Sequence, residues 1–162
     1  MNRDPVATAI LTGGVGLLER AVNYTLGSLH LVGEPSLSLA TPCTGWTVRD
    51  LLVHLDDSLT AMYEAVDEGC IGPLPSEVPA EADPRAAVRE NAVRLVGAWS
   101  NATRHEVVSV AGLPLTAGIV TGAGAIETAV HGWDLSQACG LARPLPAPLA
   151  EELLELAPLF IS

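Results

Sequence analysis

Two residues of the kind that bind metals, Glu127 and His131, stand four positions apart in a stretch that we expect to be helical. On an α-helix this spacing places both side chains on one face, a turn apart. A carboxylate oxygen and a neutral imidazole nitrogen suit zinc and other divalent first-row metals. The same spacing also occurs in ordinary surface pairs, so the pair taken alone leaves both interpretations open.

The residues around this pair are small or apolar, both before it (residues 123–126) and within it (residues 128–130). Polar side chains buried in such surroundings need a partner, and a metal ion supplies one. His54 lies in a second apolar stretch, residues 51–55, where a hydrogen-bonded core histidine is the alternative. Taken together, His54, Glu127 and His131 predict a divalent metal centre, with zinc as the expected ion.

Three further polar side chains are candidates for a catalytic role beside this centre. Asp134 follows His131 by three positions and is either an acceptor that orients the imidazole or a surface aspartate. Asp57 and Ser58 follow His54 by three and four positions, on the same helix face.

Cys43 and two tryptophans complete the residues near the expected centre. Cys43 precedes a helix start, where a thiolate is stabilised, but no histidine is evidently paired with it. We therefore favour a structural role for Cys43 over a nucleophilic one. We interpret Trp46 and Trp133 mainly as packing residues near helix ends, and a place in the wall of the pocket is the alternative.

The elements that must position these residues are helices. Hydrophobic residues make up 49% of the chain but aromatic residues only 4%, so the core is built mainly from Ala, Leu and Val, which favours an all-α fold. We expect a four-helix bundle with a short extra C-terminal helix, forming a single domain over residues 1–162. The expected helices span about 5–29, 48–68, 84–105, 117–138 and 149–159.

Local signals set several of these boundaries. Thr47 can cap the second helix, with Asp50 three residues further on and Gly69 as the stop, and Gly140 closes the fourth. Residues 31–42 and 71–84 are expected to be loops. Residues 107–121 are ambiguous: 107–110 suit a short extended segment, and Gly112 and Pro114 mark a bend.

Composition excludes several classes of function. The formal net charge is −11, and the eight basic residues are all Arg and form no cluster, so we expect neither nucleic-acid nor membrane binding. The absence of Lys removes lysine-based covalent chemistry. Three cysteines without a CxxC pair indicate no disulfide framework, and no signal peptide or membrane span is evident. We expect a cytoplasmic protein.

Two blocks of sequence carry a family resemblance. Residues 41–55, TPCTGWTVRDLLVHL, and residues 127–135, ETAVHGWDL, resemble the DinB-like, mycothiol-dependent maleylpyruvate isomerase family of metalloproteins. The resemblance implies a four-helix bundle whose metal is bound by the histidine of the first block and by the glutamate and histidine of the second. Those positions are His54, Glu127 and His131.

The resemblance also implies a function. Three protein ligands leave open positions for a low-molecular-weight thiol such as mycothiol, which would attack a small electrophile in S-transfer or cis–trans isomerisation. The alternatives are a hydrolase or lyase that uses metal-bound water, and a non-catalytic metal- or ligand-binding module. The isomerase has a further C-terminal domain, whereas this chain ends at Ser162, so we expect the fold and metal to transfer but not the specific reaction. A homodimer paired through an apolar helix face is the assembly that we expect.

Overall fold

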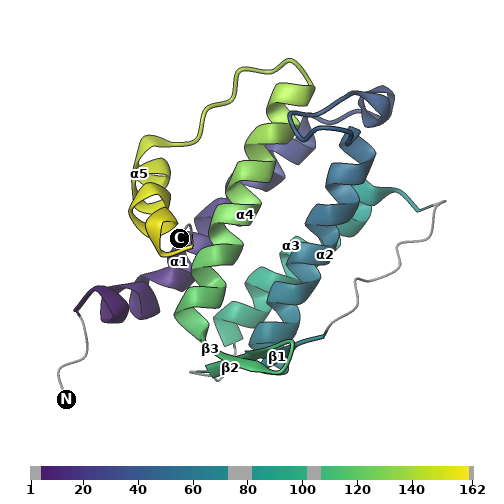
Figure 1. Ribbon diagram of the computed structural model, residues 1–162. Helices are drawn as coiled ribbons and strands as arrows, with labels where there is room; N and C mark the ends of the chain where they lie inside the picture. The colour runs from purple at the N-terminus through teal and green to yellow at the C-terminus, as the bar shows by residue number, and fades with distance from the viewer. Residues whose placement is uncertain (1–4, 73–81, 102–106, 161–162) are drawn as a thin grey trace.

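The computed structural model describes residues 5–72, 82–101 and 107–160, and its main feature is a bundle of four long helices. These are α1 (Pro5–His30), α2 (Val48–Asp67), α3 (Pro84–Asn101) and α4 (Ala117–Ala138). Helix α1 lies along α4, α2 lies along α3, and α2 also contacts α4 (Figure 1). The short helix α5 (Ala147–Leu156) packs against α1 and α4. The predicted bundle with an extra C-terminal helix is confirmed.

Leucines dominate the buried core. Leu51, Leu52, Leu55 and Leu59 recur at helical spacing on one side of α2, and each is at most 1% exposed. Burying one such side chain contributes about 1.5–3 kcal/mol, so this row fixes the rotation of α2 about its own axis. The direction in which His54 leaves the helix is thereby fixed as well.

The helix ends follow the predicted signals closely. Thr47 caps α2: its Oγ1 accepts from the backbone N of Asp50 at 3.3 Å, and its own backbone N donates to Asp50 Oδ2 at 2.9 Å. The bond from the Thr47 backbone N lowers the pKa of the Asp50 carboxyl, and so does the Thr47 hydroxyl, which donates to Asp50 Oδ2 at 2.8 Å. At the other ends, α2 is followed by Gly69 with φ +70° and α4 by Gly140 with φ +69°, the left-handed conformation that commonly closes a helix.

A small sheet covers one end of the bundle (Figure 1). Strands β2 (Val107–Val110) and β3 (Leu113–Thr116) form an antiparallel hairpin, and β1 (Cys70–Ile71) pairs with β2 in parallel. The extended segment at 107–110 was one of the predicted possibilities, whereas β1 was not predicted. The bend lies at Ala111 and Gly112, both with positive φ. Pro114, which was expected to mark it, lies in the edge strand β3, where a missing N–H is tolerated.

Two predicted segments extend beyond the described residues. The expected end of the third helix near His105 lies outside them, as does most of the expected loop 71–84. The loop predicted at 31–42 contains a short 3₁₀ helix, η1 (Glu34–Ser38). A second 3₁₀ turn, η2 (Ala157–Leu159), follows α5. Among the described helices, none combines the length and apolar character needed to cross a membrane.

Candidate metal centre

The three side chains predicted to bind a metal converge between α2 and α4. Donor atoms of His54, Glu127 and His131 all lie within 4.8 Å of one another. The carboxylate oxygen Oε1 of Glu127 is shared: it is hydrogen-bonded to His54 Nε2 and lies 3.3 Å from His131 Nε2. Residues 73 positions apart in the chain therefore meet at a single oxygen atom.

Small residues on the opposite side of α4 explain why Glu127 and His131 face α2. A Cβ atom added at Gly132 would lie 3.0 Å from the Cα of Thr25, so α4 approaches α1 closely on this side. The Thr25 hydroxyl donates to the carbonyl of Thr128 at 2.7 Å across the same contact. With this face of α4 occupied by α1, the face that carries Glu127 and His131 lies against α2.

The electrostatics of the centre favour a charged carboxylate. Hydrogen bonds with His131 and His54 lower the pKa of Glu127 to about 2, although burial acts in the opposite direction. Burial lowers the pKa of His131, but Glu127 and Asp134 together outweigh it and raise the pKa above the usual value. Glu127 is thus anionic at neutral pH. A divalent cation bound here would take the place of the proton that the imidazole holds.

Asp134 lies behind His131 and is only 5% exposed, so it is not a surface residue. Its Oδ2 atom lies 3.0 Å from His131 Nδ1. With the Nδ1 proton donated to Asp134, the Nε2 atom of the same ring is left to face Glu127. A carboxylate that accepts from one ring nitrogen while the other faces the ligand cluster is the usual arrangement around metal-binding histidines.

The other two candidate polar residues occupy different positions. Ser58 Oγ donates to Glu127 Oε1 at 3.3 Å, so Ser58 touches the cluster. Asp57 is half-buried and belongs to neither group of clustered donor atoms found in the described residues. Asp57 acts on the neighbouring Asp56, whose pKa is raised by burial and, to a smaller extent, by the charge of Asp57.

Trp46 lies beside the centre, in agreement with the alternative interpretation of this residue. Its ring centroid lies 5.0 Å from that of His54 and 6.4 Å from that of His131. The side chain is 37% exposed and forms part of the rim around the two imidazoles. The interpretation as a packing residue captured only part of this role, because the pattern around position 46 does not reveal a contact with α4. Trp133 is exposed.

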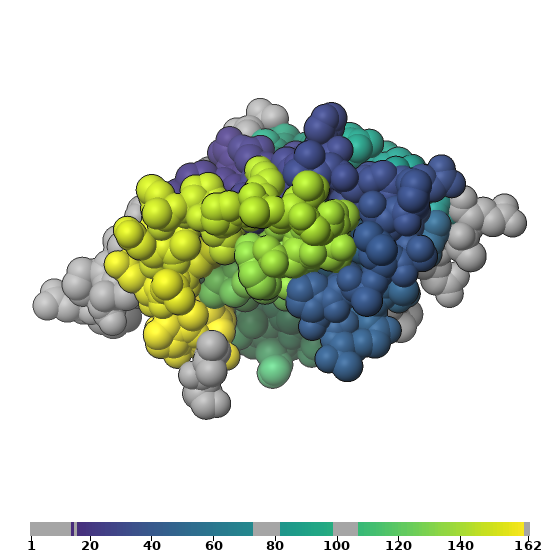
Figure 2. All heavy atoms as spheres, turned by 90° about the horizontal axis from the view of Figure 1, so that it is seen from above, coloured from purple at the N-terminus to yellow at the C-terminus, as the bar shows by residue number. Residues whose placement is uncertain are grey.

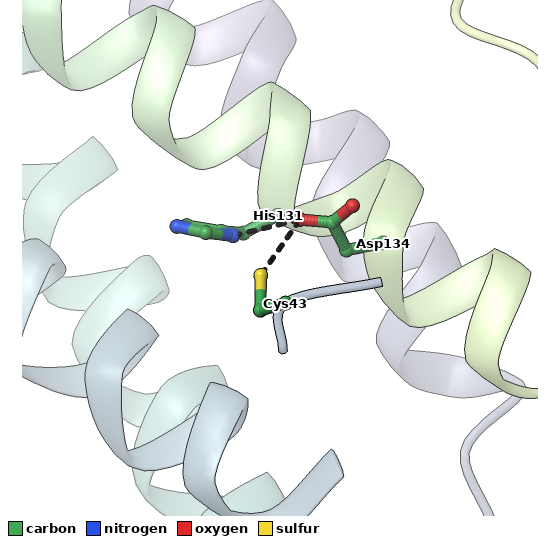
Figure 3. A group of neighbouring side chains, drawn as sticks. All are labelled: Cys43, His131 and Asp134. Carbon is green, nitrogen blue, oxygen red and sulfur yellow. Dashed lines mark hydrogen bonds and ion pairs between the residues drawn. The ribbon is translucent and has the colours of Figure 1, made fainter. Parts of the chain in front are cut away.

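Cys43 also reaches the centre from the segment between α1 and α2. Its Sγ atom lies 3.6 Å from Asp134 Oδ2 (Figure 3). Viewed from above, this segment and the C-terminal part of α4 lie side by side (Figure 2). Burial and the Asp134 carboxylate raise the pKa of the Cys43 thiol, so the sulfur keeps its proton, which disfavours a nucleophilic role.

The comparison with protein families identifies the bundle that carries this centre. Residues 18–136 match the family described as the mycothiol maleylpyruvate isomerase N-terminal domain. The chain belongs to this family. The matched region contains most of the bundle and every donor atom of the centre, from Cys43 to Asp134. No curated protein matches the chain closely enough to add a relative.

Membership of the mycothiol maleylpyruvate isomerase N-terminal domain family associates the chain with mycothiol, a low-molecular-weight thiol. The described residues also contain groups of side chains able to hold a metal ion. The family resemblance stated from the two sequence blocks is confirmed. The four-helix bundle that this resemblance implied is also the observed fold.

Proposed function

We propose that the chain binds a divalent metal ion, zinc in our proposal, through His54, Glu127 and His131, and uses it to activate a low-molecular-weight thiol such as mycothiol. The observation that carries this proposal is the convergence of the three donor atoms within 4.8 Å, in a segment that matches a mycothiol-associated family. Two imidazole nitrogens and one carboxylate oxygen form a ligand set that occurs in catalytic zinc sites.

The exposure of the ligands supports a catalytic rather than a purely structural metal. The side chains of His54 and Glu127 are 36% and 38% exposed, whereas that of His131 is 14% exposed. One side of the centre is therefore open to solvent. Structural zinc sites are closed by four protein ligands, and open positions are typical of catalytic ones. A metal ion bound here would lower the pKa of a coordinated thiol or water molecule.

The neighbouring residues have distinct parts in this proposal. Asp134 holds the proton on His131 Nδ1 and so fixes the tautomer that presents Nε2. Ser58 donates to the Glu127 carboxylate and restricts its rotation. Trp46 provides a planar apolar wall beside His54, against which a small conjugated electrophile can stack.

The substrate chemistry follows from a thiolate held next to such an electrophile. The sulfur adds to a conjugated carbon–carbon double bond, the resulting single bond rotates, and expulsion of the thiol restores the double bond in the other geometry. The net result is cis–trans isomerisation without loss of atoms. Where the thiol is not expelled, the carbanion formed by the addition takes up a proton and the product is a thioether. On an aryl halide the sulfur instead displaces halide ion, and the reaction is a transfer.

Elemental analysis of purified protein tests the metal. The unmodified protein and a His30→Ala control, which removes an exposed histidine at the end of α1, are expected to contain one equivalent of metal. His54→Ala is expected to lose most of it, because one of three ligands is removed. Equal metal content in His54→Ala and the unmodified protein would contradict the proposed centre.

Turnover with and without thiol tests the reaction class. Metal-loaded protein freed of small molecules is assayed with maleylpyruvate for isomerisation and with an aryl halide for S-transfer, each with and without added mycothiol. We expect turnover only when the thiol is present. Undiminished turnover of maleylpyruvate in thiol-free protein would favour the rival in which metal-bound water is the nucleophile.

A further inference from the structure

The hydrogen bonds that support His131 extend through Asp134 to a third side chain, that of Cys43. The Oδ2 atom of Asp134 lies 3.0 Å from His131 Nδ1 and 3.6 Å from Cys43 Sγ, so a single oxygen serves both donors (Figure 3). We propose that Cys43 is a positioning residue for the metal centre, acting by holding the Asp134 carboxylate in the orientation that faces His131. This inference rests on the proposed metal-binding function.

The position of Cys43 relative to the imidazole indicates support rather than ligation. Cys43 Sγ clusters with His131 and Asp134, whereas the cluster around Glu127 does not include it. Asp134, which the sulfur contacts, and Glu127 thus lie at opposite nitrogens of the His131 ring. A neutral imidazole that offers Nε2 to a metal carries its proton on Nδ1, and that proton is directed to Asp134. The Cys43 thiol contacts the acceptor of this bond, Asp134, and not the imidazole nitrogen that faces the metal site.

The buried state of Asp134 makes an additional donor important. The Asp134 side chain is 7% exposed, so little water reaches the lone pairs of its carboxylate. Rotation of a carboxylate about its terminal torsion is soft, so the orientation depends on the hydrogen bonds it accepts. Removing the thiol leaves His131 to hold Oδ2 without the second donor. Because a thiol is a weak donor, we expect the consequence for metal binding to be modest.

The backbone around Cys43 gives the thiol a fixed direction. The Cys43 carbonyl accepts from Trp46 N at 3.0 Å, and Cys43 N donates to Thr41 Oγ1 at 3.2 Å. The same turn carries Trp46, whose ring lies against His54. The turn before α2 therefore contacts His54 of α2 through Trp46. Through Cys43 it contacts Asp134, which supports His131 on α4. This links the two helices that supply the centre.

Competition for Co²⁺ with a chromogenic chelator measures the effect of the thiol on metal affinity. We expect Cys43→Ala to weaken binding about fivefold, less than the roughly 10–100-fold typical of a direct partner of a ligand. Cys43→Ser is expected to retain most of the affinity, because its hydroxyl can donate to the same carboxylate. Cys139→Ala, a half-buried cysteine after the end of α4, is the matched control and is expected to leave affinity unchanged. Equal affinities for Cys43→Ala and the unmodified protein would overturn the inference, as would a Cys43→Ser variant no better than Cys43→Ala.

A double-mutant cycle separates positioning from simple packing. If Cys43 acts through Asp134, Cys43→Ala should cause no further loss in an Asp134→Ala background. A further fivefold loss in that background would show that the thiol acts by packing, and would contradict the proposal. The absorption spectrum of the Co²⁺ protein provides a second readout: we expect no thiolate-to-cobalt charge-transfer band that depends on Cys43.

Failure of the two proposals would look different in these measurements. A charge-transfer band that disappears in Cys43→Ser would make Cys43 a ligand and overturn its role as a support, while metal binding itself would stand. Unmodified protein that binds no Co²⁺ would overturn the proposed function, and with it the inference.

Discussion

Glu127 and Asp56 are carboxylates in comparable places with different surroundings. Glu127 lies between α4 and α2, and Asp56 lies between α2 and α3. Glu127 interrupts an apolar helical stretch, whereas Asp56 is followed by the polar residues Asp57 and Ser58. Asp56 is 4% exposed and accepts a hydrogen bond from the Asn91 side-chain amide at 2.5 Å. The side chain of Glu127 is 38% exposed and meets the two imidazoles.

These surroundings shift the two pKa values in opposite directions. Burial raises the pKa of Asp56, and the hydrogen bond from Asn91 only partly offsets this rise. Hydrogen bonds from the imidazoles lower the pKa of Glu127 to about 2 despite its burial. A neutral amide donates a hydrogen bond to a carboxylate but offers a cation no further ligand. Two imidazoles around one carboxylate oxygen, by contrast, form a set of donor atoms among which a cation can bind. The partners of a buried acid therefore distinguish a structural position from a functional one.

The largest expected difference between the two carboxylates is in metal affinity. Glu127→Gln keeps the shape of the side chain but removes its charge, so we expect Zn²⁺ binding to weaken by more than about 100-fold, beyond the loss typical of an outer partner. Asp56→Asn is expected to leave the affinity unchanged. Competition with a chelator measures both. Comparable losses in the two variants would remove the distinction between site and structural carboxylate.

Much of the fold was predictable because its signals are local. The Thr47 cap, the Gly140 stop and the spacing of the α2 leucines are each signals that involve only residues close together in the chain. The pairing of β1 with β2 was not predictable, because Cys70 meets Ser109 across a long separation in the chain and neither segment shows strong strand periodicity.

The candidate centre, too, could be predicted only in part from the sequence. His54, Glu127 and His131 were predicted to be ligands from polar residues in apolar stretches and from the two family blocks, and their donor atoms lie together in the structure. Position 134 left two interpretations open, since spacing along a helix does not reveal what lies behind it. The contacts of Trp46 and Cys43 depend on how the turn before α2 meets α4, which only the tertiary structure shows.

A smaller effect is expected on the pH dependence of stability in the metal-free protein. The pKa of Glu127 is lowered from 4.5 to about 2, so its contribution is present above pH 4.5 and is lost as the pH falls toward 2. The pKa of His131 is raised above 6.5, so its contribution is present below pH 6.5 and is lost as the pH rises through the raised value. The pair should stabilise the metal-free fold most between these limits.

Urea unfolding of metal-free protein from pH 3 to pH 8 measures this window. Because Glu127 is partly exposed, we discount the full shift and expect Glu127→Gln to lose about 1 kcal/mol near pH 5.5. The variant should also show a flatter profile on both sides of that pH. An unchanged difference between the two proteins across the whole range would show that the imidazole–carboxylate contacts do not stabilise the metal-free fold.

The smallest effect is expected for Asp56, and it has the opposite sign. Because the folded-state pKa of Asp56 is raised, folding favours the protonated acid, and the ionised form destabilises the fold as the pH rises through that value. Asp56→Asn removes this charge while its amide oxygen can still accept from Asn91. We expect a gain of about 0.5–1 kcal/mol at pH 7 that disappears near pH 3. Glu155 is an exposed acid on α5, so Glu155→Gln controls for the general change in net charge. This control should leave the free energy of unfolding unchanged at both pH values. A loss of stability in Asp56→Asn at pH 7 would mean that the ionised carboxylate is needed by Asn91, and that Asp56 resembles Glu127 more closely than its partners indicate.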